Sequence, residues 1–343
     1  MSRSNNIQLV TKDSVKIFTT IFKELDSKSH LLLREATIPI DIIDDDKRHY
    51  LYLPESCLKN LMEVLSRNVE NHQLGVLFWR LCKDTYIPSF IERLTVGGDL
   101  KSTLDEFSNL LISDSTNAKV YLQEKGDTWW LVREKSGIDE PWFKFAEIFS
   151  VIFMCELLRN LTSHEWAPSR IGIRCDNDSD FVALPALKSV QFFTERPVTA
   201  IEIPKAFIYK KVNLIQKQRT HNISNKPVNI KNICFVEQFK MAISPYLPVG
   251  KLPIKLAAEI LRMNVRTLQR KLKNEGVVYQ VLIEEMCFEL ITRDIVETTK
   301  PITIIATQYG YSDAGHFSRA FKRIYGVSPI QYRKNNNLAR NHV

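Results

Sequence analysis

One group of cationic and apolar residues occurs twice near the end of the chain, at an offset of 49 residues. The two copies are Leu268, Arg270, Leu272 and Lys273, and then Phe317, Arg319, Phe321 and Lys322. In a helix, the apolar pair at i and i+4 packs on one face and leaves the opposite face in solvent. Arginine on such a face suits guanine O6 and N7. The chemistry expected of each copy is therefore that of a helix that reads nucleic-acid bases.

The residues before each copy predict a helix-turn-helix unit. Each copy follows a short helix with a small residue, Ala258 or Ala306, and then a tight turn. A small residue lets the paired helices approach closely. Asn264 or Asp313 begins the second helix, where its side chain can accept hydrogen bonds from the unpaired N–H groups of the first turn. The outward face of each second helix is then free to enter a major groove about 12 Å wide.

These outward faces carry the candidate DNA-binding residues. The first helix offers Arg266, Thr267, Gln269, Arg270 and Lys273, and the second offers Gly315, His316, Arg319 and Lys322. Because glutamine suits adenine as arginine suits guanine, we expect the first helix to carry more sequence readout. The second helix should depend more on DNA shape, phosphates and the thymine methyl group. The alternative for both sets is an ordinary solvated helix face, and for His316 a capping or surface histidine.

The positive charge of the chain is concentrated in the same region. Residues 251–343 hold 15 Lys and Arg against 8 Asp and Glu, whereas the other 250 residues hold 32 against 31. This asymmetry is expected of a domain that neutralises phosphates, although a solvated surface would give the same bias.

The elements around the two copies form a predicted all-α array. Apolar periodicity predicts seven helices, at residues 233–243, 254–261, 265–275, 279–297, 303–309, 314–325 and 329–333. The polar, basic residues 210–232 are interpreted as a linker, and residues 336–343 as a polar tail. Gly310 and Gly326 are expected to supply positive φ in turns.

Residues 1–209 have a mixed pattern that predicts an α+β domain. Helices are expected at 58–65, 74–81, 100–111 and 142–161, and strands at 119–123, 128–133, 170–174 and 198–203. The first two strands flank Lys125-Gly126-Asp127, a composition that suits a hairpin turn. We expect the tryptophans of this region to pack in the core, with an effector pocket as the alternative: Trp79, Trp129, Trp130 and Trp142.

Signs of catalysis, of metal binding and of membrane insertion are absent from the sequence. It has no P-loop, GxSxG or HExxH, and its six cysteines form no CxxC pair. We therefore expect no catalytic residue, cofactor or metal, and mostly buried thiols in a reducing cytoplasm. The acidic run at residues 44–46 is interpreted as a solvated loop or helix start. No apolar run approaches the roughly 20 residues of a membrane span, and no secretory signal is visible.

Residues 310–333, GYSDAGHFSRAFKRIYGVSPIQYR, closely resemble the signature of the AraC/XylS family of transcription regulators. The resemblance covers about residues 233–335. It implies a seven-helix domain in which a long helix joins two helix-turn-helix units, so that both recognition helices enter successive major grooves. The base contacts that it implies are Arg266, Gln269, Arg270, Gly315, His316 and Arg319. The chain departs from the family at Arg262, where glycine is usual, and at Cys287, where arginine is common.

Residues 1–209 also resemble the arabinose-binding-type sensor domain of one AraC subgroup, in residues 38–42, 53–54, 74–75 and 203–207. This resemblance implies a domain that senses a small-molecule effector or forms a homodimer, without enzymatic chemistry. Promoter DNA is the expected partner, and family precedent implies activation through RNA polymerase, with repression as the alternative. Two further hypotheses are an enzyme with an appended DNA-binding domain and a purely structural interaction module.

Overall fold

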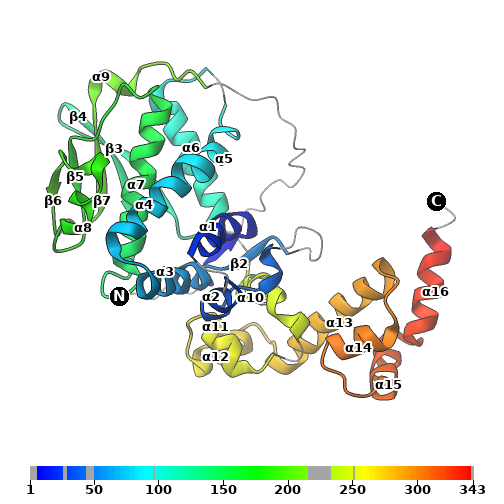
Figure 1. Ribbon diagram of the computed structural model, residues 1–343. Helices are drawn as coiled ribbons and strands as arrows, with labels where there is room; N and C mark the ends of the chain where they lie inside the picture. Colours follow the sequence, from blue (N-terminus) through cyan, green and yellow to red (C-terminus); the bar gives the residue numbers. More distant parts are fainter. Residues whose placement is uncertain are drawn as a thin grey trace. The chain divides into compact units, whose positions relative to one another are not determined.

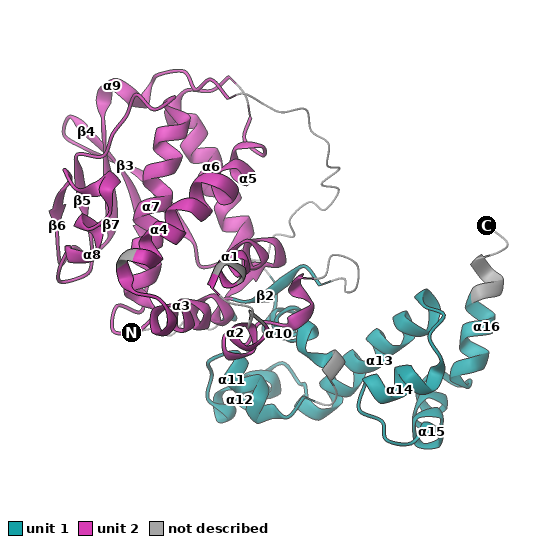
Figure 2. Cartoon of the chain, in the orientation of Figure 1, with its two compact units in different colours: residues 1–7, 48–54, 233–343 teal, residues 8–47, 55–232 magenta. Residues whose placement is uncertain are grey.

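The computed structural model describes residues 6–25, 29–43, 50–95, 97–214, 233–249 and 252–340. The chain divides into two compact units, shown in Figure 2. The larger comprises residues 8–47 and 55–232, and the smaller comprises residues 1–7, 48–54 and 233–343.

The larger unit contains both helices and strands, which are labelled in Figure 1. Its α-helices are α1 (Lys12–Leu25), α2 (Ser29–Glu35), α3 (Ser56–Asn68), α4 (Asn71–Leu81), α5 (Ile87–Ile91), α6 (Leu100–Asp114), α7 (Phe143–Leu161), α8 (Ser179–Val182) and α9 (Lys205–Ile208). They are accompanied by the 3-10 helices η1 (Ile40–Ile43) and η3 (Pro185–Leu187) and by the π-helix η2 (Cys82–Tyr86). Its strands are β1 (Leu9–Thr11), β3 (Lys119–Lys125), β4 (Thr128–Glu134), β5 (Arg170–Gly172), β6 (Gln191–Phe193) and β7 (Thr199–Pro204).

Five of these strands form one sheet in the order β3-β4-β7-β5-β6. The predicted hairpin is confirmed, because β3 and β4 pair antiparallel and Lys125 lies opposite Thr128 across the turn. Gly126 has φ +62° there, a conformation that suits glycine. Strand β7 pairs antiparallel with β4 and β5, whereas β5 and β6 run parallel. The predicted α+β fold is confirmed. The elements of this unit without a counterpart in the sequence prediction include β1, α1, α2, α5, α8, β6 and α9.

Helix α7 is the central helix of the larger unit. Fifteen of its 19 residues are buried, as its continuous apolar sequence requires, since a helix that is apolar all round must be covered on every side. It packs against β7 of the sheet and against α3 and α4. Its rings join an aromatic cluster, in which Phe149 and Phe153 stack with centroids 6.0 Å apart and both meet Tyr86.

The smaller unit holds the seven predicted helices. They are α10 (Phe235–Ile243), α11 (Ile254–Ile260), α12 (Val265–Asn274), α13 (Tyr279–Glu297), α14 (Ile302–Gln308), α15 (Ala314–Tyr325) and α16 (Pro329–Arg340), with the short turn η5 (Ser244–Val249) and strand β2 (Tyr52–Pro54). Helix α16 runs seven residues beyond its predicted end at residue 333. Most of the predicted linker, residues 215–232, lies outside the described residues.

The smaller unit also includes segments from the first 54 residues, a feature that the sequence pattern does not predict. The Ile7 N–H donates to Gln238 Oε1 at 2.8 Å, and the Gln238 amide in turn donates to the Ile233 carbonyl at 3.0 Å. Strand β2 packs against α10. Gln238 is only 2% exposed, so these partners satisfy a buried polar group on the first helix of the domain.

Candidate DNA-binding site

The first helix-turn-helix unit consists of α11, a tight turn and α12. Leu268 and Leu272 are fully buried and anchor α12. Helix α11 packs against α12, and its Ala258 is 2% exposed. At the N-terminus of α10, backbone N–H groups of Phe235 and Val236 donate to the Glu275 carboxylate at the end of α12, at 2.9 and 3.0 Å. These contacts fix α12 by its apolar face and by its C-terminus.

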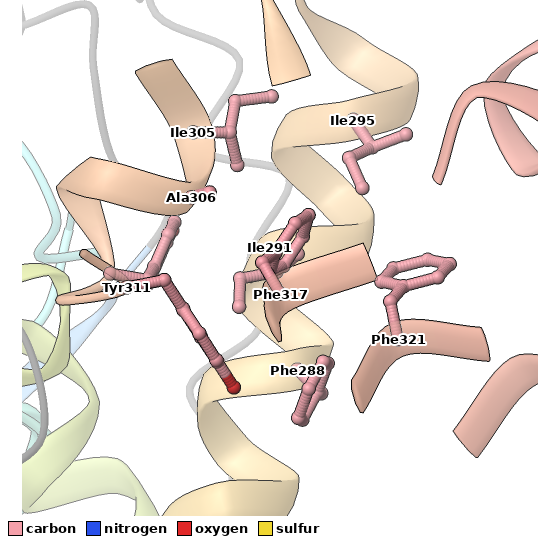
Figure 3. Close-up of a cluster of buried hydrophobic side chains, with 9 residues drawn as sticks. Phe288, Ile291, Ile295, Ile305, Ala306, Tyr311, Phe317 and Phe321 are labelled. Atoms are coloured by element: carbon pink, nitrogen blue, oxygen red, sulfur yellow. The ribbon is translucent and has the colours of Figure 1, made fainter. Parts of the chain in front are cut away.

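The second unit consists of α14, a turn and α15, and its core is shown in Figure 3. Phe317 and Phe321 of α15 are fully buried against Phe288 and Ile291 of α13, and Ala306 of α14 lies in the same cluster. The Phe317 and Phe321 rings have centroids 5.9 Å apart. The predicted anchor residues of both units are therefore confirmed as core residues.

Both predicted N-caps are also confirmed. The Asn264 side chain accepts from the Arg266 N–H at 2.8 Å, and the Asp313 carboxylate accepts from Gly315 and His316 N–H groups at 3.0 and 2.8 Å. The hydrogen bonds from Gly315 and His316, together with the nearby Arg319, lower the pKa of Asp313. The caps orient the first turn of each recognition helix, which is the part that reaches base edges in a groove.

The two turns end their first helices in the same way. In the first, Arg262 N–H donates to Glu259 O and Met263 N–H to Ala258 O, at 2.9 and 2.8 Å. In the second, the corresponding bonds run from Gly310 to Thr307 and from Tyr311 to Ala306, both at 3.0 Å. This is the Schellman arrangement, which requires a left-handed residue after the helix. The second turn has one more residue before its N-cap than the first. Equivalent residues are therefore 48 positions apart at Ala258 and Ala306, and 49 positions apart from Asn264 and Asp313 onward.

The predicted contact residues form an outward face on each recognition helix. All of them are exposed except Thr267, which is half-buried: Arg266, Gln269, Arg270, Lys273, Gly315, His316, Arg319 and Lys322. In the second unit, Arg319 folds toward the helix N-terminus, where its Nη2 lies 3.9 Å from Asp313 Oδ2. The His316 ring lies 5.9 Å from that of Tyr311, between centroids. Both faces are thus cationic and accessible, and opposite the buried anchors.

Helix α13 belongs to the cores of both units. Its first half packs on η5 and places Tyr279 against Phe239 of α10, and its second half supplies Phe288, Ile291 and Ile295 to the second core. With 19 residues it is about 28 Å long at 1.5 Å per residue. Cys287, one of the two departures from the family pattern, is a buried residue of this helix.

The fold and this arrangement define a double helix-turn-helix domain, in which one long helix joins two units. Residues 257–335 match the family model described as "Helix-turn-helix domain". The C-terminal part of the chain is therefore a helix-turn-helix domain of the AraC type, as its signature predicts.

The curated relatives match this domain. The porin thermoregulatory protein EnvY of Escherichia coli is 30% identical over 79 residues, which are 23% of this chain and 31% of EnvY. The regulator VqsM of Pseudomonas aeruginosa is 33% identical over 76 residues, 22% of this chain and 23% of VqsM. The chain thus matches less than a third of the length of these relatives, which are named as regulators and not as enzymes. Among solved structures, the regulator CdpR of Pseudomonas aeruginosa is similar over 89% of this chain and 96% of its own, with 15% identity and a TM-score of 0.38.

Other expectations concern the larger unit. Trp129 and Trp142 are buried, as predicted for core residues, whereas Trp79 and Trp130 are half-buried. Four of the six cysteines are buried: Cys57, Cys82, Cys155 and Cys287. Among the helices that the structure describes, none has the length and apolarity needed to cross a membrane. The resemblance of residues 1–209 to an arabinose-binding-type sensor stays a prediction.

Proposed function

We propose that the chain is a sequence-specific transcription regulator that binds double-stranded DNA through α12 and α15 in two successive major grooves. One observation carries the proposal: both exposed cationic faces are built on the two cores that α13 joins. The length of α13, about 28 Å, is close to the roughly 34 Å that separates successive grooves on one face of B-DNA.

The roles of the individual side chains follow from their chemistry. Arg266, Gln269 and Arg270 on α12 are proposed to read base edges, and Thr267 and Lys273 to contact the same region of DNA. On α15, Gly315 permits close approach of the backbone, and His316 and Arg319 contact bases or the thymine methyl group. Lys322 is proposed as a phosphate contact. The Asp313–Arg319 pair would open when the guanidinium turns toward DNA.

The larger unit is proposed to control the domain, by binding a small-molecule effector or by forming a homodimer. Activation through RNA polymerase in the cytoplasm is the outcome that the AraC resemblance favours. An enzyme fused to a DNA-binding domain receives less support, because the matched relatives are named as regulators. Within the described residues, no group of His, Cys, Asp or Glu is arranged to hold a metal.

Selection of bound duplexes from a random pool by the full chain tests this function. The expected result is a recovered motif with two half-sites about one helical turn apart. Replacing Arg270 by Ala should then weaken binding to that motif by roughly ten- to a hundredfold, with little effect on random DNA. Arg67→Ala, at an exposed position of α3, is the control. If the pool yields no preferred sequence, the proposal fails; if Arg270→Ala weakens both DNAs equally, Arg270 contacts phosphate only.

A further inference from the structure

The larger unit contains a cavity of about 80 Å³ with one charged wall and one aromatic wall. The aromatic wall is formed by side chains of α1, η2 and α7, with a tryptophan at the start of α7: Phe18, Tyr86, Trp142, Phe149 and Phe153. The charged wall is formed by α3, its preceding residue and β4 with the residue that follows it: Glu55, Lys59, Arg133 and Lys135. The charged wall therefore holds three cations and one carboxylate beside an apolar space, which is the composition of a small-molecule site.

The single carboxylate of this wall already has its partners. Glu55 is 3% exposed, and its oxygens lie 3.0 Å from Lys59 Nζ and 3.5 Å from Lys135 Nζ. The Asn117 amide also donates to both of them, at 3.3 and 3.2 Å. Although burial alone would raise it, the two lysines lower the pKa of Glu55 to about 2. Glu55 is therefore ionised at neutral pH and committed to the two lysines.

Arg133 is the cation of the charged wall that is not paired with Glu55 by a hydrogen bond. Its side chain is half-buried and lines the cavity, and nothing in the described part of the chain accepts a hydrogen bond from its guanidinium. Glu147 is a buried carboxylate whose charge also acts on Arg133, and its oxygens accept from the backbone N–H groups of Arg174 and Cys175 and from the Thr199 hydroxyl. Burial lowers the pKa of Arg133 although the charges of Glu55 and Glu147 oppose this shift, so the guanidinium is partly desolvated and has no hydrogen-bonded counterion among the described residues.

We propose that this cavity binds a small organic monocarboxylate, whose carboxylate pairs with Arg133 and whose apolar body packs against the aromatic wall. Arginine matches a carboxylate with two parallel hydrogen bonds, and a single negative charge supplies the missing counterion. The apolar wall favours a hydrocarbon body over inorganic phosphate. The inference rests on the proposed function in one respect, since it identifies the chemical class of the effector.

Thermal unfolding of the full chain tests the site with three probes, benzoate, phenylacetate and hexanoate, each compared with its neutral amide at constant ionic strength. At least one carboxylate should raise Tm further as its concentration increases, as a ligand of the folded state does, while its amide and inorganic phosphate should not. If none of the carboxylates raises Tm, or if the amides raise it equally, the proposal is overturned. Stabilisation by phosphate alone would also contradict it, because the site would then bind inorganic anions.

Two variants and a control assign the binding to Arg133. Arg133→Met keeps the apolar stem and should raise the dissociation constant of the binding carboxylate by tenfold or more in calorimetric titration. Arg133→Lys should retain part of the affinity. Arg196→Met changes an exposed arginine that lies over the Phe193 ring, and it should leave affinity unchanged. An unfolding curve of each variant without ligand establishes that it is folded. Unchanged affinity in a folded Arg133→Met variant would overturn the proposal.

DNA binding by the same samples separates the two proposals. A chain that selects a DNA motif and binds none of the carboxylates overturns the ligand site and leaves the proposed function intact. A chain that binds a carboxylate through Arg133 but prefers no DNA sequence overturns the proposed function and leaves the ligand site intact.

Discussion

Arg262 and Gly310 occupy equivalent positions in the two helix-turn-helix units, and both have positive φ, at 48° and 81°. Each follows the last turn of a helix and donates its N–H within a Schellman arrangement. Glycine adopts this conformation freely, but a residue with a Cβ does so at a cost of roughly 1–2 kcal/mol. The first turn therefore has the same backbone geometry as the second although it has arginine in place of glycine.

Replacing Arg262 by Gly and by Ala separates this backbone cost from the contacts of the arginine side chain. Both variants remove the side chain, but only glycine relieves the left-handed conformation. We expect the Gly variant to be more stable than the Ala variant by about 0.5–1 kcal/mol, because the greater chain entropy of unfolded glycine offsets part of the relief. Urea unfolding of the full chain measures the difference. At Glu285, exposed within α13, the order should be reversed, since glycine is the poorer helix former. An Ala variant at residue 262 as stable as the Gly variant would contradict the argument.

The stability that the Asp313 cap contributes should depend on pH. The folded state lowers the pKa of Asp313 from its usual 3.8, chiefly through the hydrogen bonds from Gly315 and His316. A lowered folded pKa means that the contribution is complete above about pH 4 and is lost as the pH falls through the folded value. We therefore expect wild type to have a higher Tm than Asp313→Asn at pH 6, and the gap to narrow at pH 3. Calorimetry at both pH values measures the gap, and a gap that is constant with pH would exclude a titrating cap.

The alanine at the α14–α15 contact should not tolerate a larger side chain. Ala306 is 1% exposed within the core of the second unit, so Ala306→Leu adds three carbons among side chains that are themselves buried. Overpacking of this kind costs roughly 1–3 kcal/mol. Ile304→Leu, at a neighbouring position that is 55% exposed, should change stability by less than about 0.5 kcal/mol. Chemical denaturation of both variants tests the prediction, which fails if Ala306→Leu unfolds at the wild-type midpoint.

A phosphate contact at Lys322 should be visible in the salt dependence of DNA affinity. The charge is exposed on α15, and removing one phosphate contact should reduce the magnitude of the slope of log K against log salt by about 0.9. We expect Lys322→Ala to show this reduction with equal losses on selected and random duplexes. Fluorescence anisotropy over a range of salt concentrations provides both values. A loss confined to the selected motif would instead assign Lys322 to base reading.

The helical domain could be predicted from sequence because its signals are local. The i, i+4 anchors, the caps Asn264 and Asp313 and the small Ala306 each act within one or two turns, and the structure confirms them. DNA contact by the outward residues cannot be predicted from local signals in the same way. An exposed arginine has the same local sequence pattern whether its helix face binds DNA or only contacts solvent.

Several features that the sequence did not predict depend on residues far apart in the chain. The Ile7–Gln238 hydrogen bond joins residues 231 positions apart, and no periodic pattern encodes such a pairing. Strand β6 has only three residues and pairs with β5, which is itself short, so it offers too little alternation to detect. The cavity beside Arg133 likewise requires the hairpin, α1, α3 and α7 to meet, and the sequence contains only its separate parts.

The number of residues in the shared helix α13 determines both the spacing and the relative rotation of the two helix-turn-helix units. Each residue added to or deleted from its middle would rotate one core relative to the other by about 100° and shift it by about 1.5 Å. A single-residue insertion there would point the outward faces of α12 and α15 in different directions while leaving each fold intact. Side chains on either recognition helix can be substituted one at a time. The length of α13 cannot change by a single residue without turning the two outward faces apart.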